Sequence, residues 1–329
     1  MGGTDVFTAT DFHGLYAIIP TPAVTGAERI DAVNTVDLVE SARLVERLLA
    51  DGAHALIALG TTGECPTLAP EDYDAFVDCV MTTVKGRVPT FIGATALGAH
   101  EALRRLRFVQ DRGATGSLLG LPMWQPLTTE MAVRYYAEIS EALPDLAIMA
   151  YANARAFRYT FPAGFWAGVA EKAPTVTSAK FSNPAQLAEF QAASQGRVHF
   201  LPIDQRVHEF YAIAPETTTA CWATAAAMGP EPSLAIIDAI AAKDQARIHA
   251  AAGEIAWANE PIDSILGNPE LFAHYNIQVE KLRMEAAGYC RPGPARPPYD
   301  VIPDEHAEAA RECGRRWVKV CERCRGECR

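Results

Sequence analysis

The sequence lacks any apolar run long enough to cross a membrane. Its longest runs, such as residues 146–151, fall far short of the roughly 20 residues that a bilayer requires. A basic segment followed by an apolar one, the pattern of a secretion signal, is also missing near the start. We therefore expect a cytoplasmic protein that does not bind membranes.

Positive charge is in short supply. The 29 lysines and arginines are outnumbered by 40 aspartates and glutamates, so the net charge at pH 7 is −11. Because no block of the sequence is rich in lysine or arginine, nucleic acid is a poor partner. An anionic substrate would need local positive groups, since the field of the whole protein would repel it.

The eight cysteines do not form a pattern typical of secreted proteins. Four are scattered, and four crowd the end of the chain, namely Cys313, Cys321, Cys324 and Cys328. Their spacing supplies enough thiolates for a tetrahedral metal site but matches no standard one. A zinc or cluster site and a frayed helix with reduced thiols both stay open, and the irregular spacing favours the helix.

Segments typical of strands and helices alternate through residues 15–242. We expect strands near 15–20, 55–59, 90–93, 116–121, 146–151, 175–180, 198–203 and 217–222. We expect helices near 36–49, 70–84, 99–112, 129–143, 162–172, 184–194, 205–213 and 234–242. Apolar and β-branched strands suit a sheet that is covered on both faces. The pattern predicts an α/β fold, a (β/α)8 TIM barrel, since an open doubly wound sheet would carry a GxGxxG motif that is missing here.

The remainder of the chain, residues 243–329, is expected to be a helical extension that ends in the Cys-rich tail. Helices are predicted near 243–259 and 269–287, followed by a loop rich in proline at 291–303 and a last helix. We expect these elements to pack on the barrel, which would span residues 1–242, and between subunits.

Lysine is scarce, and one of the six has a special position. Lys180 ends the β-branched strand 175–180, whereas the other five lie in expected helices or at their ends. A lysine among apolar neighbours loses solvation of its charged form, so its pKa falls and the neutral amine can attack a carbonyl. The alternative is a strand-end lysine that extends into solvent.

Other strand ends carry residues that suit chemistry. The second strand ends in Gly-Thr-Thr-Gly-Glu at 60–64, the fourth in Leu-Pro-Met-Trp at 121–124, and the fifth in Tyr-Ala-Asn at 151–153. On a barrel these ends face one mouth. A small loop with two hydroxyl groups can receive a carboxylate, and a phenol can give and take protons.

Taken together, the Gly-Thr-Thr-Gly-Glu loop, the strand-five tyrosine and the strand-six lysine resemble the class I aldolases that include dihydrodipicolinate synthase and N-acetylneuraminate lyase. The resemblance implies that Lys180 forms a Schiff base with pyruvate or another 2-oxo acid, and that Tyr151 shuttles protons. It implies that Thr61, Thr62 and Gly63 hold the pyruvyl carboxylate. It also implies that no cofactor or metal is needed and that the chain assembles as a homotetramer.

Two departures from the synthases point to an aryl substrate. The synthases usually show Tyr-Asn-x-Pro-x-Arg after strand five, but residues 151–157 read Tyr-Ala-Asn-Ala-Arg-Ala-Phe. Trp124 takes the place of a tyrosine that the synthases donate across a subunit interface, and an indole offers an apolar face rather than a proton relay. The chain thus resembles the hydratase-aldolases of aromatic hydrocarbon breakdown, which convert trans-o-hydroxybenzylidenepyruvate or trans-2′-carboxybenzalpyruvate to an aromatic aldehyde and pyruvate. This resemblance implies that Asn153 orients water or the C4 oxygen and that Trp124 lines the ring pocket.

Several points stay open. Arg155 and Arg158 favour a carboxylate on the aryl ring, whereas a phenol there would need only a neutral partner. Both arginines can equally be solvated loop charges. Rival functions are a synthase or lyase acting on another 2-oxo acid and a non-catalytic 2-oxo acid sensor. A metal-dependent aldolase would need a carboxylate or histidine cluster at the strand ends, which the sequence does not show. Trp222, Cys221 and Asp204 are expected to shape the pocket without an assigned role.

Overall fold

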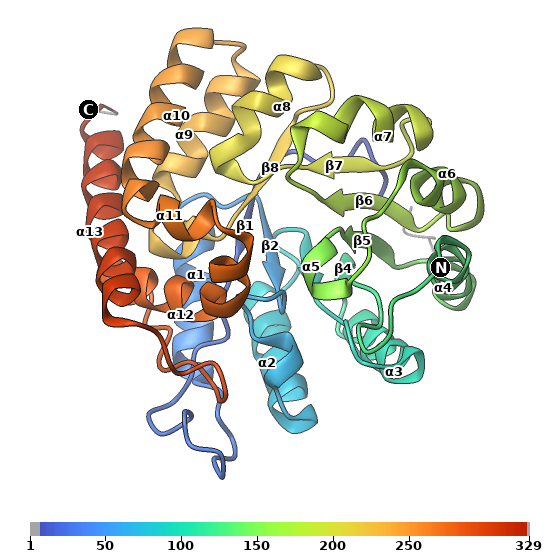
Figure 1. The fold of residues 1–329 in the computed structure, drawn as a ribbon, viewed down its shortest axis with the longest axis horizontal. Helices are drawn as coiled ribbons and strands as arrows, with labels where there is room; N and C mark the ends of the chain where they lie inside the picture. Colours follow the sequence, from blue (N-terminus) through green and yellow to red (C-terminus); the bar gives the residue numbers. More distant parts are fainter. Residues whose placement is uncertain (1–6, 328–329) are drawn as a thin grey trace.

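A computed structural model describes residues 7–327, and its centre is a barrel of parallel strands (Figure 1). The eight strands within those residues are β1 (Gly14–Ile18), β2 (Ala55–Ala58), β3 (Thr90–Ile92), β4 (Gly116–Leu119), β5 (Ala147–Tyr151), β6 (Val176–Lys180), β7 (His199–Leu201) and β8 (Ala220–Ala223). Strands β1 to β7 pair in chain order, and β8 pairs with β1. A parallel bridge between Ile203 and Trp222 joins β7 to β8. The predicted (β/α)8 barrel is confirmed.

The strands are buried along almost their whole length. All five residues of β5 and all four of β2 are buried. One face of each strand fills the barrel and the other packs beneath the helices, so apolar and β-branched residues are favoured at every position. This is why the strands lack the alternation of a half-exposed sheet.

Helices separate the strands and cover the outside of the barrel. Those between consecutive strands are α1 (Leu38–Ala50), α2 (Pro70–Val84), α3 (Ala99–Asp111), α4 (Thr129–Ala142), α6 (Ala163–Lys172), α7 (Leu187–Ala193) and α8 (Val207–Ile213), and α9 (Glu231–Ala241) follows β8. Side-chain caps mark some of the starts: Asp37 accepts the N–H of Glu40, and Thr128 accepts that of Met131. The sequence did not predict the short helix α5 (Ala154–Phe157), which follows β5.

The last quarter of the described chain is helical and shares the barrel's core. It consists of α10 (Gln245–Asn259), α11 (Asp263–Leu266), α12 (Pro269–Ala287) and α13 (Asp304–Glu327). Ile248, Met284 and Trp317 from these helices belong to the same buried cluster as the barrel strands. Residue 242 therefore marks the end of the repeating strand and helix pattern, and the core continues past it.

The Cys-rich tail is a packed helix rather than a frayed one. Cys313 and Cys321 are buried on α13, and between them the indole N–H of Trp317 donates to the carbonyl of Gly229 over 3.0 Å. Cys328 lies outside the described residues. Across residues 7–327, no three His, Cys, Asp or Glu side chains come together in a way that could hold a metal ion. In the same part of the chain, no helix has both the length and the apolar content needed to span a membrane.

Candidate active site

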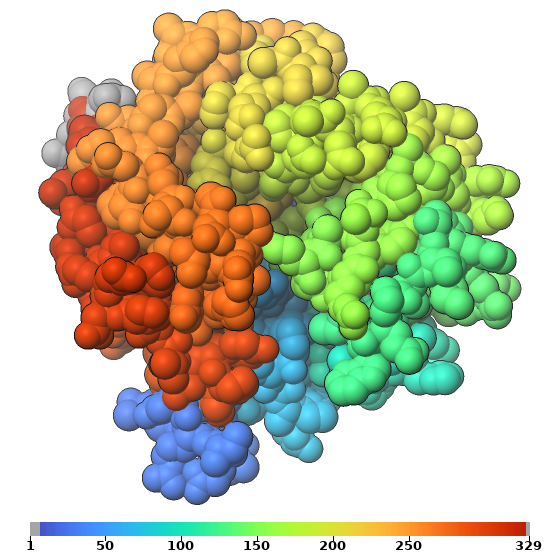
Figure 2. Space-filling model, in the orientation of Figure 1, coloured from blue at the N-terminus to red at the C-terminus, as the bar shows by residue number. Residues whose placement is uncertain are grey.

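A cavity of about 480 Å³ opens where the strands end. Its lining comes from the ends of β5, β6 and β8, from the loop after β2, and from α5 and α12. Figure 2 shows the molecule hollowed between the orange segment of α11 and α12 and the green segment around α5. The cavity thus lies at the mouth where the sequence predicted the chemistry.

Lys180 is the last residue of β6 and lies beside Tyr151, the last residue of β5. Its Nζ atom lies 3.3 Å from the ring centre of Trp222 and 4.8 Å from that of Tyr151. Burial lowers the pKa of Lys180, although the charges of Tyr151 and Glu280 oppose this shift. The neutral, nucleophilic amine is therefore more populated than it would be in water.

The hydroxyl group of Tyr151 is held by two neighbours. It lies 2.8 Å from Oγ1 of Thr61, and Nδ2 of Asn153 donates to it over 3.4 Å. Burial raises the pKa of Tyr151, but the charge of Lys180 and the hydrogen bonds of Thr61 and Asn153 outweigh burial and lower the pKa overall. A phenol tuned in this way can exchange protons with a substrate bound at Lys180.

The predicted carboxylate loop is a tight turn after β2. Thr61 and Thr62 line the cavity, but Gly63 does not. A Cβ atom on Gly63 would lie 2.7 Å from the backbone nitrogen of Leu59, so no other residue fits the turn. Gly63 therefore shapes the loop, and the two threonines face the substrate space.

Asn153 caps a helix and also faces Tyr151. Its Oδ1 atom accepts the N–H of Ala156 and so caps α5, while its amide nitrogen faces the hydroxyl of Tyr151. The cap fixes the side chain, because an Asn at this position satisfies a free N–H of the first helical turn.

The expectation that Trp124 lines the ring pocket is wrong for a single chain. Its side chain is 76% exposed and is not part of the cavity lining. The loop after β4 carries it over the surface, where its carbonyl accepts a hydrogen bond from Arg158 over 3.2 Å. Besides Tyr151, the aromatic residues that line the cavity are Trp222, Phe161, Phe181 and Phe272.

Helix α12 supplies a wall that the sequence analysis missed. Phe272, Asn276, Glu280 and Arg283 all line the cavity. Their spacing of three and four residues puts them on one helix face, and this spacing is a signal that could have been read. Glu280 and Arg283 form an ion pair with a 2.7 Å contact.

Only one of the two loop arginines reaches the cavity. Arg155 lines it, with its guanidinium 4.5 Å from the ring centre of Phe272 and a hydrogen bond to the carbonyl of Pro269. Arg158 does not line it. Trp222, which the sequence placed near the pocket without a role, contacts Lys180 directly.

Several known proteins match this chain over almost its whole length. The trans-O-hydroxybenzylidenepyruvate hydratase-aldolase of Pseudomonas putida is 37% identical over 96% of this chain and 96% of its own length. The trans-2′-carboxybenzalpyruvate hydratase-aldolase of Nocardioides sp. (strain KP7) is 39% identical over 95% of each chain. The solved structure of PhdJ bound to substrate intermediate is 33% identical, with a TM-score of 0.92 over 96% of this chain and 98% of that one.

The family model named Dihydrodipicolinate synthetase family matches residues 21–156, which include the carboxylate loop and Tyr151. The named relatives align far beyond that range, at 37% and 39% identity over almost the whole chain. The protein therefore belongs to the dihydrodipicolinate synthetase family, in the branch whose members are hydratase-aldolases.

Proposed function

We propose that the protein is a carbon–carbon lyase that hydrates an aryl-idenepyruvate and cleaves the product to an aromatic aldehyde and pyruvate through a Schiff base on Lys180. The observation that carries the proposal is the position of Lys180, whose Nζ atom faces Trp222 and Tyr151 at the cavity. The names of the full-length relatives support the same reaction. The iminium is itself the electron sink, so we infer that the reaction needs no cofactor.

The first stage is imine formation. The neutral amine of Lys180 attacks the keto carbon, C2, and loss of water leaves a protonated imine. Tyr151 relays the protons that this exchange requires, while the hydroxyl and N–H groups of Thr61 and Thr62 hold the pyruvyl carboxylate. The ring face of Trp222, 3.3 Å from Nζ, favours the positive charge that the imine carries.

The second stage is hydration followed by cleavage. Conjugation with the iminium makes C4 electrophilic, so water adds there and C3 takes up a proton. Tyr151 then removes the proton of the new C4 hydroxyl, the C3–C4 bond breaks, and its electrons pass into the iminium to give an enamine. Aldehyde leaves, the enamine is protonated at C3, and hydrolysis of the imine releases pyruvate. Asn153 is placed to orient the water or the C4 oxygen, because its amide group faces the Tyr151 hydroxyl.

The site also bears on the substituent of the aryl ring. The arginines that line the cavity are already engaged: Arg155 donates to the carbonyl of Pro269, Arg206 pairs with Glu209, and Arg283 pairs with Glu280. A second substrate carboxylate would have to displace one of these contacts, whereas a phenol needs only a neutral partner. Arg158, which the sequence suggested as a partner for that carboxylate, does not line the cavity. We therefore propose the ortho-hydroxy compound as the better substrate.

We further propose a cytoplasmic homotetramer. Apolar side chains stand exposed on adjacent elements of one side of the barrel: Leu97 after β3, Trp124 after β4 and Met131 at the start of α4 are 62%, 76% and 55% exposed. Contact with a second copy would cover them. Trp124 then belongs to an interface, which is where the family resemblance puts its loop.

Borohydride reduction in the presence of pyruvate should attach a reduced pyruvyl group to Lys180. The reason is that an amine at this position forms a reducible imine. Intact-mass and peptide analysis would locate the group. Lys180→Arg should abolish the adduct, and Lys172→Arg, at the end of α6, should leave it unchanged. A folded wild-type protein without an adduct would overturn the mechanism and favour a sensor.

Replacing Tyr151 with Phe should slow imine formation by roughly 10²-fold or more, since a general acid–base group is lost. It should also shift the pH profile. The rate rises as Lys180 loses its proton, with a midpoint below the ordinary pKa of 10.5. The negative phenolate raises the pKa of Lys180, so its removal should move the midpoint to lower pH. Trapping rates with pyruvate and cyanoborohydride measure both effects. Tyr159→Phe, which loses only a bond to Thr129, is the control, and an upward shift in Tyr151→Phe would contradict the coupling.

A substrate panel should show kcat/KM about tenfold higher for trans-o-hydroxybenzylidenepyruvate than for trans-2′-carboxybenzalpyruvate, and little turnover of a non-aromatic 2-oxo acid. Glu280→Gln should shift this preference toward the carboxy compound, because it frees Arg283 to receive the second carboxylate. The matched control is Glu312→Gln, which breaks a Glu–Arg pair on α13 far from the cavity lining. A preference that does not change in Glu280→Gln would contradict this assignment.

Trp124→Glu should convert the tetramer to smaller species, because a charge would be buried at the contact between copies. Sedimentation velocity would measure the change. Trp257→Glu places the same charge on α10 and should leave the mass unchanged. An unaltered tetramer in Trp124→Glu would place the contact elsewhere.

A further inference from the structure

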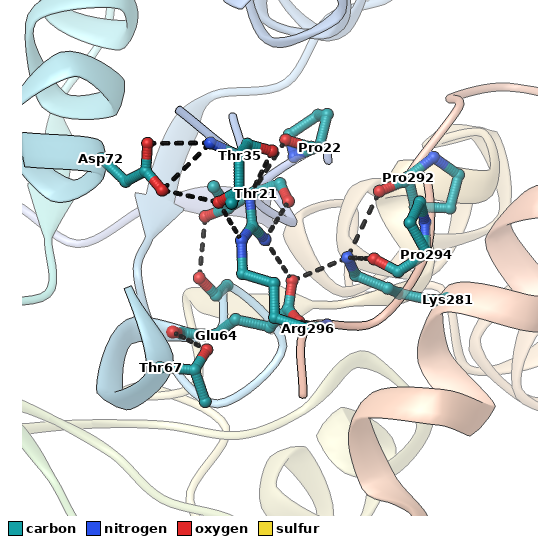
Figure 3. A network of polar contacts seen from close by, with 11 residues as sticks. Thr21, Pro22, Thr35, Glu64, Thr67, Asp72, Lys281, Pro292, Pro294 and Arg296 are labelled. Carbon is teal, nitrogen blue, oxygen red and sulfur yellow. Dashed lines mark hydrogen bonds and ion pairs between the residues drawn. The ribbon is translucent and has the colours of Figure 1, made fainter. Parts of the chain in front are cut away.

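A buried group of charges surrounds Glu64 at the end of the carboxylate loop (Figure 3), and none of its charged residues lines the cavity. Its centre is Glu64, the last residue of the Gly-Thr-Thr-Gly-Glu loop, whose side chain is fully buried. Lys281 from α12 and Arg296 from the loop before α13 both contact its Oε2 atom at 2.6 Å. Residues of the C-terminal region thus contact a loop that follows the second strand.

The two cations are satisfied on every side. Arg296 also donates its backbone N–H to Glu64 over 2.7 Å and its Nε–H to the hydroxyl of Thr35 over 2.7 Å. That hydroxyl donates in turn to Asp72. Lys281 donates to the carbonyls of Pro292 and Pro294 over 3.3 and 2.6 Å. Two carboxylates and two cations balance, which is the condition under which buried charges are tolerated.

The loop itself has a backbone that needs support. Leu59 and Glu64, at its two ends, have φ angles of 58° and 52°, in the left-handed region that side chains other than glycine rarely adopt. Such backbone conformations persist where several surrounding contacts hold the residue in place. At Gly63 the hydroxyl of Thr21 donates to the carbonyl over 2.7 Å. At Glu64 the two ion pairs serve the same purpose.

We propose that Lys281 and Arg296 are positioning residues for the substrate carboxylate. By fixing Glu64 they hold Thr61 and Thr62 where the carboxylate binds. The proposal rests on the proposed function, because it takes the threonines to be the carboxylate site. Neither cation lines the cavity, so neither acts on the substrate directly.

The effect should depend on the carboxylate of the ligand. Without Lys281 the charge of Glu64 is only partly matched, and the loop can relax away from the geometry that receives a carboxylate. Small displacements of a positioning group cost up to about 100-fold. A ketone without a carboxylate does not use the loop and should be indifferent to it.

The experiment measures borohydride trapping on Lys180 as a function of ketone concentration, with pyruvate and with acetone, in Lys281→Met and in Glu64→Gln. For pyruvate we expect the half-saturating concentration to rise about tenfold or more, while the maximal rate changes less than about threefold. For acetone we expect the wild-type concentration dependence. Lys243→Met, which breaks an exposed pair with Glu216, is the matched control and should behave as wild type.

The outcomes separate this proposal from the proposed function. A wild-type protein without a Lys180 adduct would disprove the function itself. Suppose that the wild type forms the adduct. If either folded variant then has a half-saturating pyruvate concentration within twofold of the wild-type value, the positioning role is overturned. An equal loss for pyruvate and acetone would also overturn it. Circular dichroism checks folding: if one variant unfolds the other decides, and if both unfold, the group maintains the fold rather than the loop and the proposal fails.

Discussion

The hydrogen bond between the hydroxyls of Tyr151 and Thr61 joins parts of the chain that lie 90 residues apart. Tyr151 ends β5, and Thr61 lies in the turn after β2. The bond brings the end of β5 and the Gly-Thr-Thr-Gly-Glu turn together beside Lys180. It requires that both strands end at the same mouth, which parallel strands in a closed barrel ensure. The other features of the site fix one of these partners or tune its charge.

Desolvation and mutual charge decide how Lys180 and Tyr151 share protons. Burial disfavours the ammonium form of Lys180, while its remaining charge favours the phenolate form of Tyr151. The two groups therefore titrate as a pair rather than singly. Trp222 adds an aromatic face that suits a positive charge without offering a counter-ion that would quench the nucleophile.

The C-terminal helices are part of the site. On one side α12 presents Phe272, Asn276, Glu280 and Arg283 to the cavity. Lys281, which follows Glu280 on the same helix, contacts Glu64 at the end of the carboxylate loop. A single helix therefore lines the cavity and also contacts the loop that carries Thr61 and Thr62, so changes in the extension that follows the barrel can affect both.

The sequence by itself determined the barrel, the order of its strands, and the residues at the strand ends. Apolar strands of regular spacing identify a covered parallel sheet, and the ends of such strands must converge. This placed Lys180, Tyr151, Asn153, Thr61 and Thr62 at one mouth of the barrel, while the roles predicted for them came from the resemblance to the class I aldolases. Only the tertiary structure placed Trp124 on the surface, made Trp222 the neighbour of Lys180, and brought Lys281 and Arg296 to Glu64. The physical reason is that these contacts join elements separated by 40 to 230 residues through loops and an added helix, and local periodicity carries no information about the direction in which a loop leaves a strand.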